Sequence, residues 1–99
     1  MKLDHLAFAL DAVSQGFDVD ATDLLIISSV VEKNKTGDVY TMKFIKEFKS
    51  VSQATVHARM KKLIDKGLLA RTGDEKNLRV KKLQPTDKTE ELVKFLESI

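Results

Sequence analysis

The residues best suited to bind another molecule lie between Ser52 and Lys66, where apolar and polar side chains alternate with a helical period. One side of the expected helix is an apolar stripe at positions i, i+4, i+7 and i+8, made of Val56, Met60, Leu63 and Ile64. The opposite arc holds small, polar and cationic side chains: Ala54, Thr55, His57, Ala58, Lys61 and Lys62, with Gln53 and Arg59 on its flanks. Small residues allow close approach to a groove, while amide, imidazole and guanidinium groups reach base edges and ammonium groups reach phosphates. This helix is therefore predicted to read the major groove of double-stranded DNA.

Ser52 stands directly before this helix and is a favourable N-cap residue. The first backbone N–H groups of a capped helix, together with its dipole, favour a nearby anion. We therefore expect the start of the helix to lie close to a DNA phosphate.

The charge of the chain is unevenly distributed. The stretch from Thr41 to Lys82 holds 12 of the 17 basic residues and 4 of the 15 acidic residues, which gives it a formal charge of +8 and the two flanks together −6. A basic segment between acidic ends is a usual electrostatic footprint of nucleic-acid binding. The other interpretation of this pattern is a solvated, lysine-rich surface.

Several functional classes find no support in the residues. The 99-residue chain has no cysteine, and its two histidines, His5 and His57, are far apart, so we expect no metal site. No Gly-rich phosphate loop, nucleophile elbow or facing pair of carboxylates is present, so we expect neither a cofactor nor an enzyme. The longest apolar run, residues 24–27, is too short to span a bilayer, and the start of the chain does not resemble a secretory signal, which favours the cytoplasm.

The elements that position these side chains follow from periodicity and caps. We expect a first helix from about Lys2 to Gln15, stopped by Gly16, and a central, buried helix that begins after Asp20 and ends before Gly37. A very short strand follows at Val39 and Tyr40. The next helix is expected to be capped by Thr41 and to bury four residues: Met42, Phe44, Ile45 and Phe48. Leu25 and Ile26 are expected to widen the buried face of the central helix.

A polar, Gly-containing loop between two short apolar and basic runs predicts a hairpin over residues 68–83. Gly67 ends the helix before it, Pro85 ends its second strand, and Thr86 caps a last helix. The expected fold is mainly α with a small β-hairpin wing: a winged helix-turn-helix with flanking N- and C-terminal helices. We expect a single domain over residues 1–99, with an N-terminal helix in 1–19, a winged-helix core in 20–84 and a C-terminal helix in 85–99.

The run from Val51 to Arg71 resembles the recognition helix and first wing strand of MarR-type bacterial regulators, and the similarity extends from about Asp20 to Leu96. The resemblance implies a dimeric winged-helix transcription regulator, with a recognition helix at about 52–66 and a wing at about 68–83. Its turn carries Lys49 and Ser50 where the family usually has a glycine, and its terminal helices are shorter than the family's. A small-molecule effector, common in the family, has no support from this chain's own residues.

The family's wing has an Asp-x-Arg pattern whose arginine enters the minor groove, and two registers fit this sequence. Strand alternation places Asp74 and Lys76 at the pattern, whereas counting back from Thr86 places Asn77 and Arg79 there. The first fits the wing geometry, and Arg79 is the better minor-groove reader by chemistry. The complete predicted DNA-binding set is Ser52, Gln53, Ala54, Thr55, His57, Arg59, Lys61, Lys62, Arg71, Lys76, Arg79 and Lys81.

Two hypotheses from different classes follow. In the first, the protein is a sequence-specific double-stranded DNA-binding regulator that forms a homodimer through the surplus apolar side chains of its terminal helices. In the second, it is a winged-helix adaptor that binds a protein partner such as a polymerase or replication factor. The basic middle segment favours the first, because a protein-docking face is more often apolar.

Overall fold

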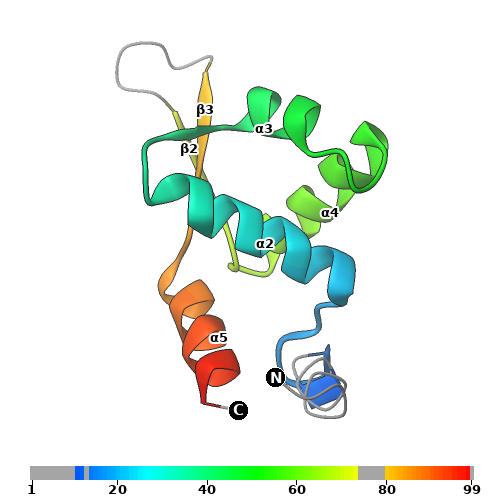
Figure 1. Ribbon diagram of the computed structural model, residues 1–99, viewed down its shortest axis with the longest axis vertical. Helices are drawn as coiled ribbons and strands as arrows, with labels where there is room; N and C mark the ends of the chain where they lie inside the picture. Colours follow the sequence, from blue (N-terminus) through cyan, green and yellow to red (C-terminus); the bar gives the residue numbers. More distant parts are fainter. Residues whose placement is uncertain (1–10, 13, 74–79, 99) are drawn as a thin grey trace.

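A computed structural model describes residues 11–12, 14–73 and 80–98. Its elements follow one another in the order α2 (Ala21–Asn34), β1 (Val39–Tyr40), α3 (Thr41–Glu47), α4 (Gln53–Asp65), β2 (Ala70–Gly73), β3 (Lys81–Gln84) and α5 (Asp87–Glu97) (Figure 1). Residues 11–12 and 14–17 are also helical and are called the N-terminal helical segment below. This segment includes Gly16, so the expected stop at Gly16 is wrong; Asp18, with φ of 56°, makes the left-handed turn instead.

The start of α2 is held by a capping box formed by Asp20, the expected N-cap residue, and Asp23. The Asp20 carboxylate accepts a hydrogen bond from the Asp23 backbone N–H, and the Asp23 carboxylate accepts one from the Asp20 backbone N–H. Ile26, Ile27 and Val30 are buried, which confirms α2 as the central helix. Leu25 does not widen this face: its side chain is 54% exposed, because a helix with a buried stripe at this spacing turns position 25 away from the core.

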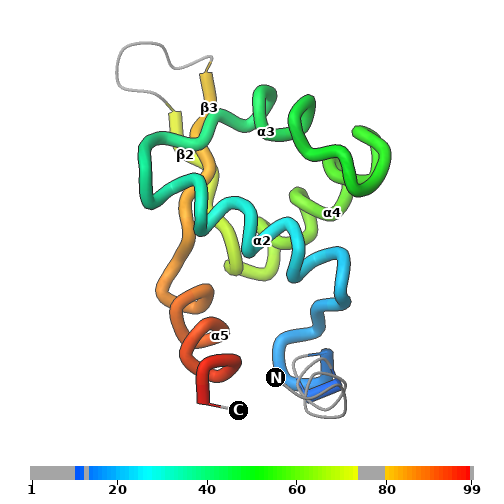
Figure 2. Tube along the Cα trace, viewed as in Figure 1, coloured from blue at the N-terminus to red at the C-terminus, as the bar shows by residue number. Residues whose placement is uncertain are grey.

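The short helix α3 leads into α4 through residues 48–52 at one side of the molecule (Figure 2). Two expectations for α3 are wrong. Thr41 is its first residue rather than its cap, because the Thr41 hydroxyl donates to the backbone oxygen of Lys81 in β3. Met42 is 63% exposed, since Phe44 and Ile45 already fill the core side of a helix of two turns.

The end of α4 turns back sharply at Gly67, whose φ of 77° is a conformation that favours glycine. The backbone N–H groups of Leu68 and Leu69 both donate to the Leu63 oxygen. These two buried residues therefore satisfy a backbone oxygen of the last turn of α4. The hairpin expected from residue 68 therefore begins only at Ala70, the first residue of β2.

The three strands form an antiparallel sheet in the order β1-β3-β2. Leu83 lies at its centre, opposite Val39 of β1 and Arg71 of β2. Lys81 of β3 lies opposite Gly73 of β2. This sheet and the helices around it confirm the predicted architecture, which is mainly α with a small hairpin wing.

The core is one apolar cluster to which every helix from α2 to α5 contributes. At the end of the molecule opposite the tips of β2 and β3, α5 lies beside the N-terminal helical segment (Figure 1). The rings of Phe17 and Phe95 join them, with centroids 6.1 Å apart. The capping residue of α5, Thr86, also donates to the Gly67 oxygen, which ties α5 to the end of α4.

Candidate nucleic-acid interface

The side of α4 that carries the predicted contacts faces solvent. Gln53, Ala54, His57, Lys61 and Lys62 are all exposed, and Thr55 is half-buried. The opposite side of the helix is buried in the core, as the apolar stripe predicts. A helix of 13 residues therefore presents one continuous polar and cationic arc.

The N-terminus of α4 is capped but carries no negative charge of its own. The Ser52 hydroxyl accepts a hydrogen bond from the Thr55 backbone N–H and lies 2.9 Å from the Thr55 hydroxyl. No acidic residue occupies the first turn. The partial positive charge of this helix end is thus left available to an external anion.

Two basic side chains of the sheet point toward the helices. Arg71 pairs directly with the buried Leu83, and directly opposed residues share one face of a sheet. Lys81 lies two residues before Leu83, so it shares that face as well. Both residues are nevertheless exposed.

A hollow of about 240 Å³ joins the arc of α4 to β2. His57 and Lys61 of α4 and Arg71 of β2 all line it, so three predicted contacts from two elements meet at one place. Asp65, which the sequence analysis did not single out, lines the same hollow. It follows Lys61 by one helical turn, a spacing that would have placed both residues on the same side of α4.

Arg59 is the predicted contact whose position differs most from expectation. Its guanidinium lies 2.6 Å from Asp20 Oδ2 and 3.7 Å from Asp23 Oδ2, so it binds the start of α2 within the same chain. Sequence reasoning missed this cluster because Asp20 and Arg59 are 39 positions apart and no local pattern links them.

The electrostatics of this cluster depend on the cap of α2. The hydrogen bond from the Asp23 backbone N–H lowers the pKa of Asp20 most strongly, and the Arg59 guanidinium lowers it further against the opposing effect of partial burial. The side chain of Asp23 is only 8% exposed, and its Oδ1 has no hydrogen-bond partner among the described residues. Arg59 is therefore the cation nearest to a buried carboxylate.

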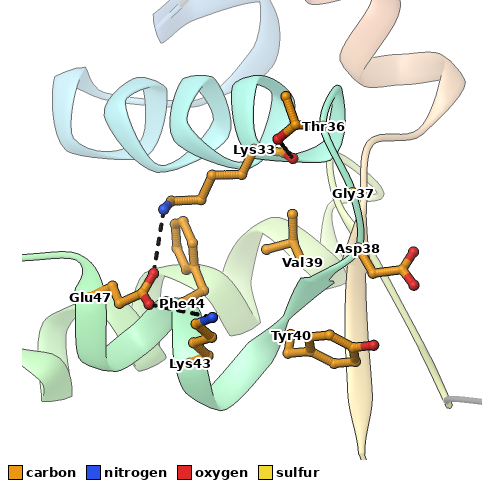
Figure 3. Close-up of a pocket in the computed structure, with 9 residues that line it drawn as sticks. All are labelled: Lys33, Thr36, Gly37, Asp38, Val39, Tyr40, Lys43, Phe44 and Glu47. Atoms are coloured by element: carbon orange, nitrogen blue, oxygen red, sulfur yellow. Dashed lines mark hydrogen bonds and ion pairs between the residues drawn. The ribbon is translucent and has the colours of Figure 1, made fainter.

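A second hollow, of about 250 Å³, lies between the end of α2, β1 and α3 (Figure 3). Lys33 and Lys43 converge on Glu47 there, with Nζ–Oε distances of 3.4 and 3.9 Å. Because Glu47 lies between the two ammonium groups, it offsets their charge and braces α3 against α2. This hollow offers an anion less attraction than the arc of α4 does.

Residues 74–79, which include Lys76 and Arg79 and both wing registers, lie outside the described part of the chain. Within the described residues, no group of three or more His, Cys, Asp or Glu side chains is placed to hold a metal ion. The same residues include no helix with the length and apolar character needed to cross a membrane.

The sequence model of one protein family, the ArnR1-like winged-helix domain, matches residues 17–99. The chain belongs to this family. A search of curated protein sequences gives no significant match. The family assignment agrees with the fold, in which α3, α4 and the sheet form a winged helix.

Solved structures of transcription regulators, MarR among them, share this fold. The chain is similar to a mutant of Escherichia coli MarR in complex with operator DNA, with a TM-score of 0.68 and 14% identity over 91% of this chain and 61% of that one. It is also similar to the regulator BldR of Sulfolobus solfataricus, with a TM-score of 0.64 and 21% identity over 92% and 63% of the two chains. A transcriptional regulator of Thermotoga maritima gives a TM-score of 0.68 and 21% identity over 97% and 68%. The chain thus spans about three-fifths of the length of MarR and BldR.

Proposed function

We propose that the protein is a sequence-specific double-stranded DNA-binding protein that regulates transcription. In this proposal α4 enters the major groove and the hairpin wing contacts the minor groove or the backbone. The observation that carries the proposal is the meeting of His57, Lys61 and Arg71 around one hollow on the exposed side of α4. A DNA-binding regulator acts where the chromosome is, which agrees with the expected cytoplasmic location.

The proposed contacts divide by chemistry. Gln53 and His57, both exposed, are the proposed contacts to base edges, and Ala54 would allow close approach. Ser52 and Thr55 leave the start of α4 open to a phosphate. The remaining proposed contacts are cationic and neutralise the backbone: Lys61, Lys62, Arg71 and Lys81, with Lys76 and Arg79 of the wing. The solved structure of mutant MarR with operator DNA supports this arrangement by likeness of fold.

Salt dependence tests the proposal directly. Affinity for a random 20-base-pair duplex, measured by fluorescence anisotropy over a series of salt concentrations, should give a log–log slope of about −4 to −5 if about five phosphates are neutralised. A slope near zero, or no binding at low salt, would remove DNA from the proposal.

A protein partner is the second candidate, and one observation favours it. Met42 is 63% exposed and Tyr40, two residues earlier, is 36% exposed, which leaves apolar surface at the start of α3. If the salt slope is flat, an adaptor that docks on a protein through this surface becomes the better hypothesis.

We also propose a homodimer formed by the terminal helices. Phe95 and Leu96 of α5 are only half-buried, and Phe17 of the N-terminal helical segment packs against Phe95 at the same end of the molecule. A two-fold dimer would place two α4 helices about 34 Å apart on a palindromic site. Sedimentation equilibrium at micromolar concentration should give twice the monomer mass, and Leu96→Asp should return the monomer. A wild-type monomer would contradict the dimer.

A further inference from the structure

We infer that Arg59 is a positioning residue rather than a DNA contact, and that Arg59 and Lys66 fix the rotation of α4 about its own axis. The inference rests on the proposed DNA binding, and it replaces the predicted role of Arg59. The contacts that carry it join α4 to residues 18–23, which comprise the connection after the N-terminal helical segment and the first turn of α2.

The Arg59–Asp20 and Lys66–Asp18 contacts, called the two clamps below, lie on one side of α4. Arg59 binds Asp20 at 2.6 Å, and Lys66, the C-cap residue of α4, binds the Asp18 carboxylate at 3.1 Å and the Asp18 backbone oxygen. Positions 59 and 66 are seven residues apart, which is close to two full helical turns. Two polar contacts on the same side, one in the middle of the helix and one at its end, resist rotation of α4 relative to α2.

The apolar core sets which side of α4 is buried, and the two polar contacts add directional restraint to it. Val56, Met60 and Leu63 are buried, but the hydrophobic effect that holds them has no preferred direction. A charge-assisted hydrogen bond is directional. A rotation of about 20° moves a side-chain tip ~6 Å from the helix axis by about 2 Å, which is enough to break a hydrogen bond to a base edge.

Moving Arg59 to DNA would be costly for the protein. The side chain of Asp23 is 8% exposed, so withdrawal of the guanidinium would leave a buried carboxylate without its nearest cation. Asp20 would also become an unpaired negative charge beside a helix that has to approach a polyanion. The arginine is therefore better placed to hold the helix than to read the groove.

The variant Asp20→Asn gives two opposite expectations. Asparagine is as good an N-cap as aspartate, so α2 keeps its cap while Arg59 loses the nearer of its two charged partners and keeps Asp23. If charge alone governs binding, removing an acid should raise the affinity for DNA. If the clamp positions α4, the affinity for a duplex selected by the wild-type protein from a random library should fall by about tenfold. The affinity for a random duplex of the same length should change by less than about twofold, because backbone contacts tolerate small shifts.

Arg59→Gln and the double variant, which combines Asp20→Asn with Arg59→Gln, complete a double-mutant cycle with Asp20→Asn. We expect Arg59→Gln to weaken selected-site binding by a similar factor, and the double variant to be no weaker than either single one. The salt slope should stay as in the wild type, whereas Lys61→Ala, the matched loss of an exposed cation on α4, should reduce it by about one. Asp18→Asn tests the second clamp, since asparagine tolerates the left-handed φ found at position 18.

Two controls separate folding from positioning. All affinities are measured well below the thermal midpoint of each variant, which circular dichroism establishes. Amide chemical shifts of the free proteins in ¹H–¹⁵N spectra should change along the exposed arc of α4 in Asp20→Asn, from Gln53 to Lys62, and not only beside the substitution.

The inference is overturned if Asp20→Asn binds the selected duplex as well as or better than the wild type, or if Arg59→Gln lowers the salt slope by about one. It is equally overturned if the shift changes stop at the immediate neighbours of Asp20. Failure of the proposed function gives a different result, because the wild-type protein would then bind neither duplex while the chemical shifts would still report the clamp.

Discussion

Helices α4 and α5 have similar lengths and the same kind of cap, yet they differ in charge and burial. Ser52 caps α4, whose first turn has no acidic residue, while Thr86 caps α5, whose first turn contains Asp87 and Glu90. The start of α5 therefore has its own counter-charges, and the start of α4 is left for an external anion. Helix α5 thus completes the domain, whereas the start of α4 can accept an external anion.

Burial follows the same division. Val56, Met60 and Leu63 hold α4 in the core, whereas Leu92 is the one fully buried apolar residue that α5 contributes within the described chain. In the proposed function α4 presents side chains to DNA, and its three buried residues would hold it firmly for that role. The looser apolar side of α5 suits contacts that a second copy of the chain would complete.

The largest expected effect tests the difference in burial between α4 and α5. Leu63→Ala should lower the free energy of unfolding by about 3 kcal/mol, because Leu63 has no exposed surface and its removal leaves a cavity. Leu96→Ala should lower it by about 1 kcal/mol, since Leu96 is only half-buried. Urea denaturation measures both. Equal losses of unfolding free energy for the two variants would show that α5 packs as firmly as α4. A loss for Leu96→Ala that depends on protein concentration would indicate the dimer.

The caps come next. Thr86→Ala should lower the free energy of unfolding by up to about 2 kcal/mol, because it removes the cap of α5 and the 2.6 Å hydrogen bond to the Gly67 oxygen. Ser52→Ala should lower it by about 1 kcal/mol. Thermal denaturation followed by circular dichroism gives the two values. Only Ser52→Ala should also weaken DNA binding. If Thr86→Ala weakened it by the same amount, the start of α4 would be no more important for DNA binding than the start of α5.

Charge is tested by a matched pair of lysines. Lys61→Ala on α4 should weaken binding to a random duplex about fivefold, which is about 1 kcal/mol, and reduce the salt slope by about one. Lys94→Ala, which removes a lysine of the last turn of α5, should leave both quantities unchanged. Fluorescence anisotropy at several salt concentrations measures them, and equal effects of the two variants would mean that long-range charge, not the surface of α4, attracts DNA.

The smallest effect concerns the acid dependence of stability. The pKa of Asp20 is lowered in the folded protein, so its carboxylate stabilises the fold above the pKa of the unfolded chain, ~3.9. That stabilisation is lost as the pH falls through the lower folded pKa. The difference in unfolding free energy between the wild type and Asp20→Asn should be constant from neutral pH to about pH 5 and should shrink in acid. Urea denaturation from pH 7 to pH 2 tests this, and a difference that does not shrink would exclude the Asp20 carboxylate as its source.

Local signals predicted most of the elements. The caps Asp20, Ser52 and Thr86 and the turn at Gly67 work through hydrogen bonds and backbone angles within a few residues, so the sequence alone located them. The apolar stripe of α4 likewise determined which side of this helix is buried. The errors at Leu25 and Met42 have another origin, because an apolar residue is buried only if a neighbouring element covers its position.

The tertiary structure alone decided which charged side chains remain available. By its sequence, Arg59 is as suitable a DNA contact as Lys61, since both are cations on the polar side of one helix. Folding brings Asp20 and Asp23 to Arg59 and brings Arg71 to Lys61. Helical periodicity determines the direction of a side chain from its own helix, but its partner depends on how distant segments pack, which no local pattern encodes.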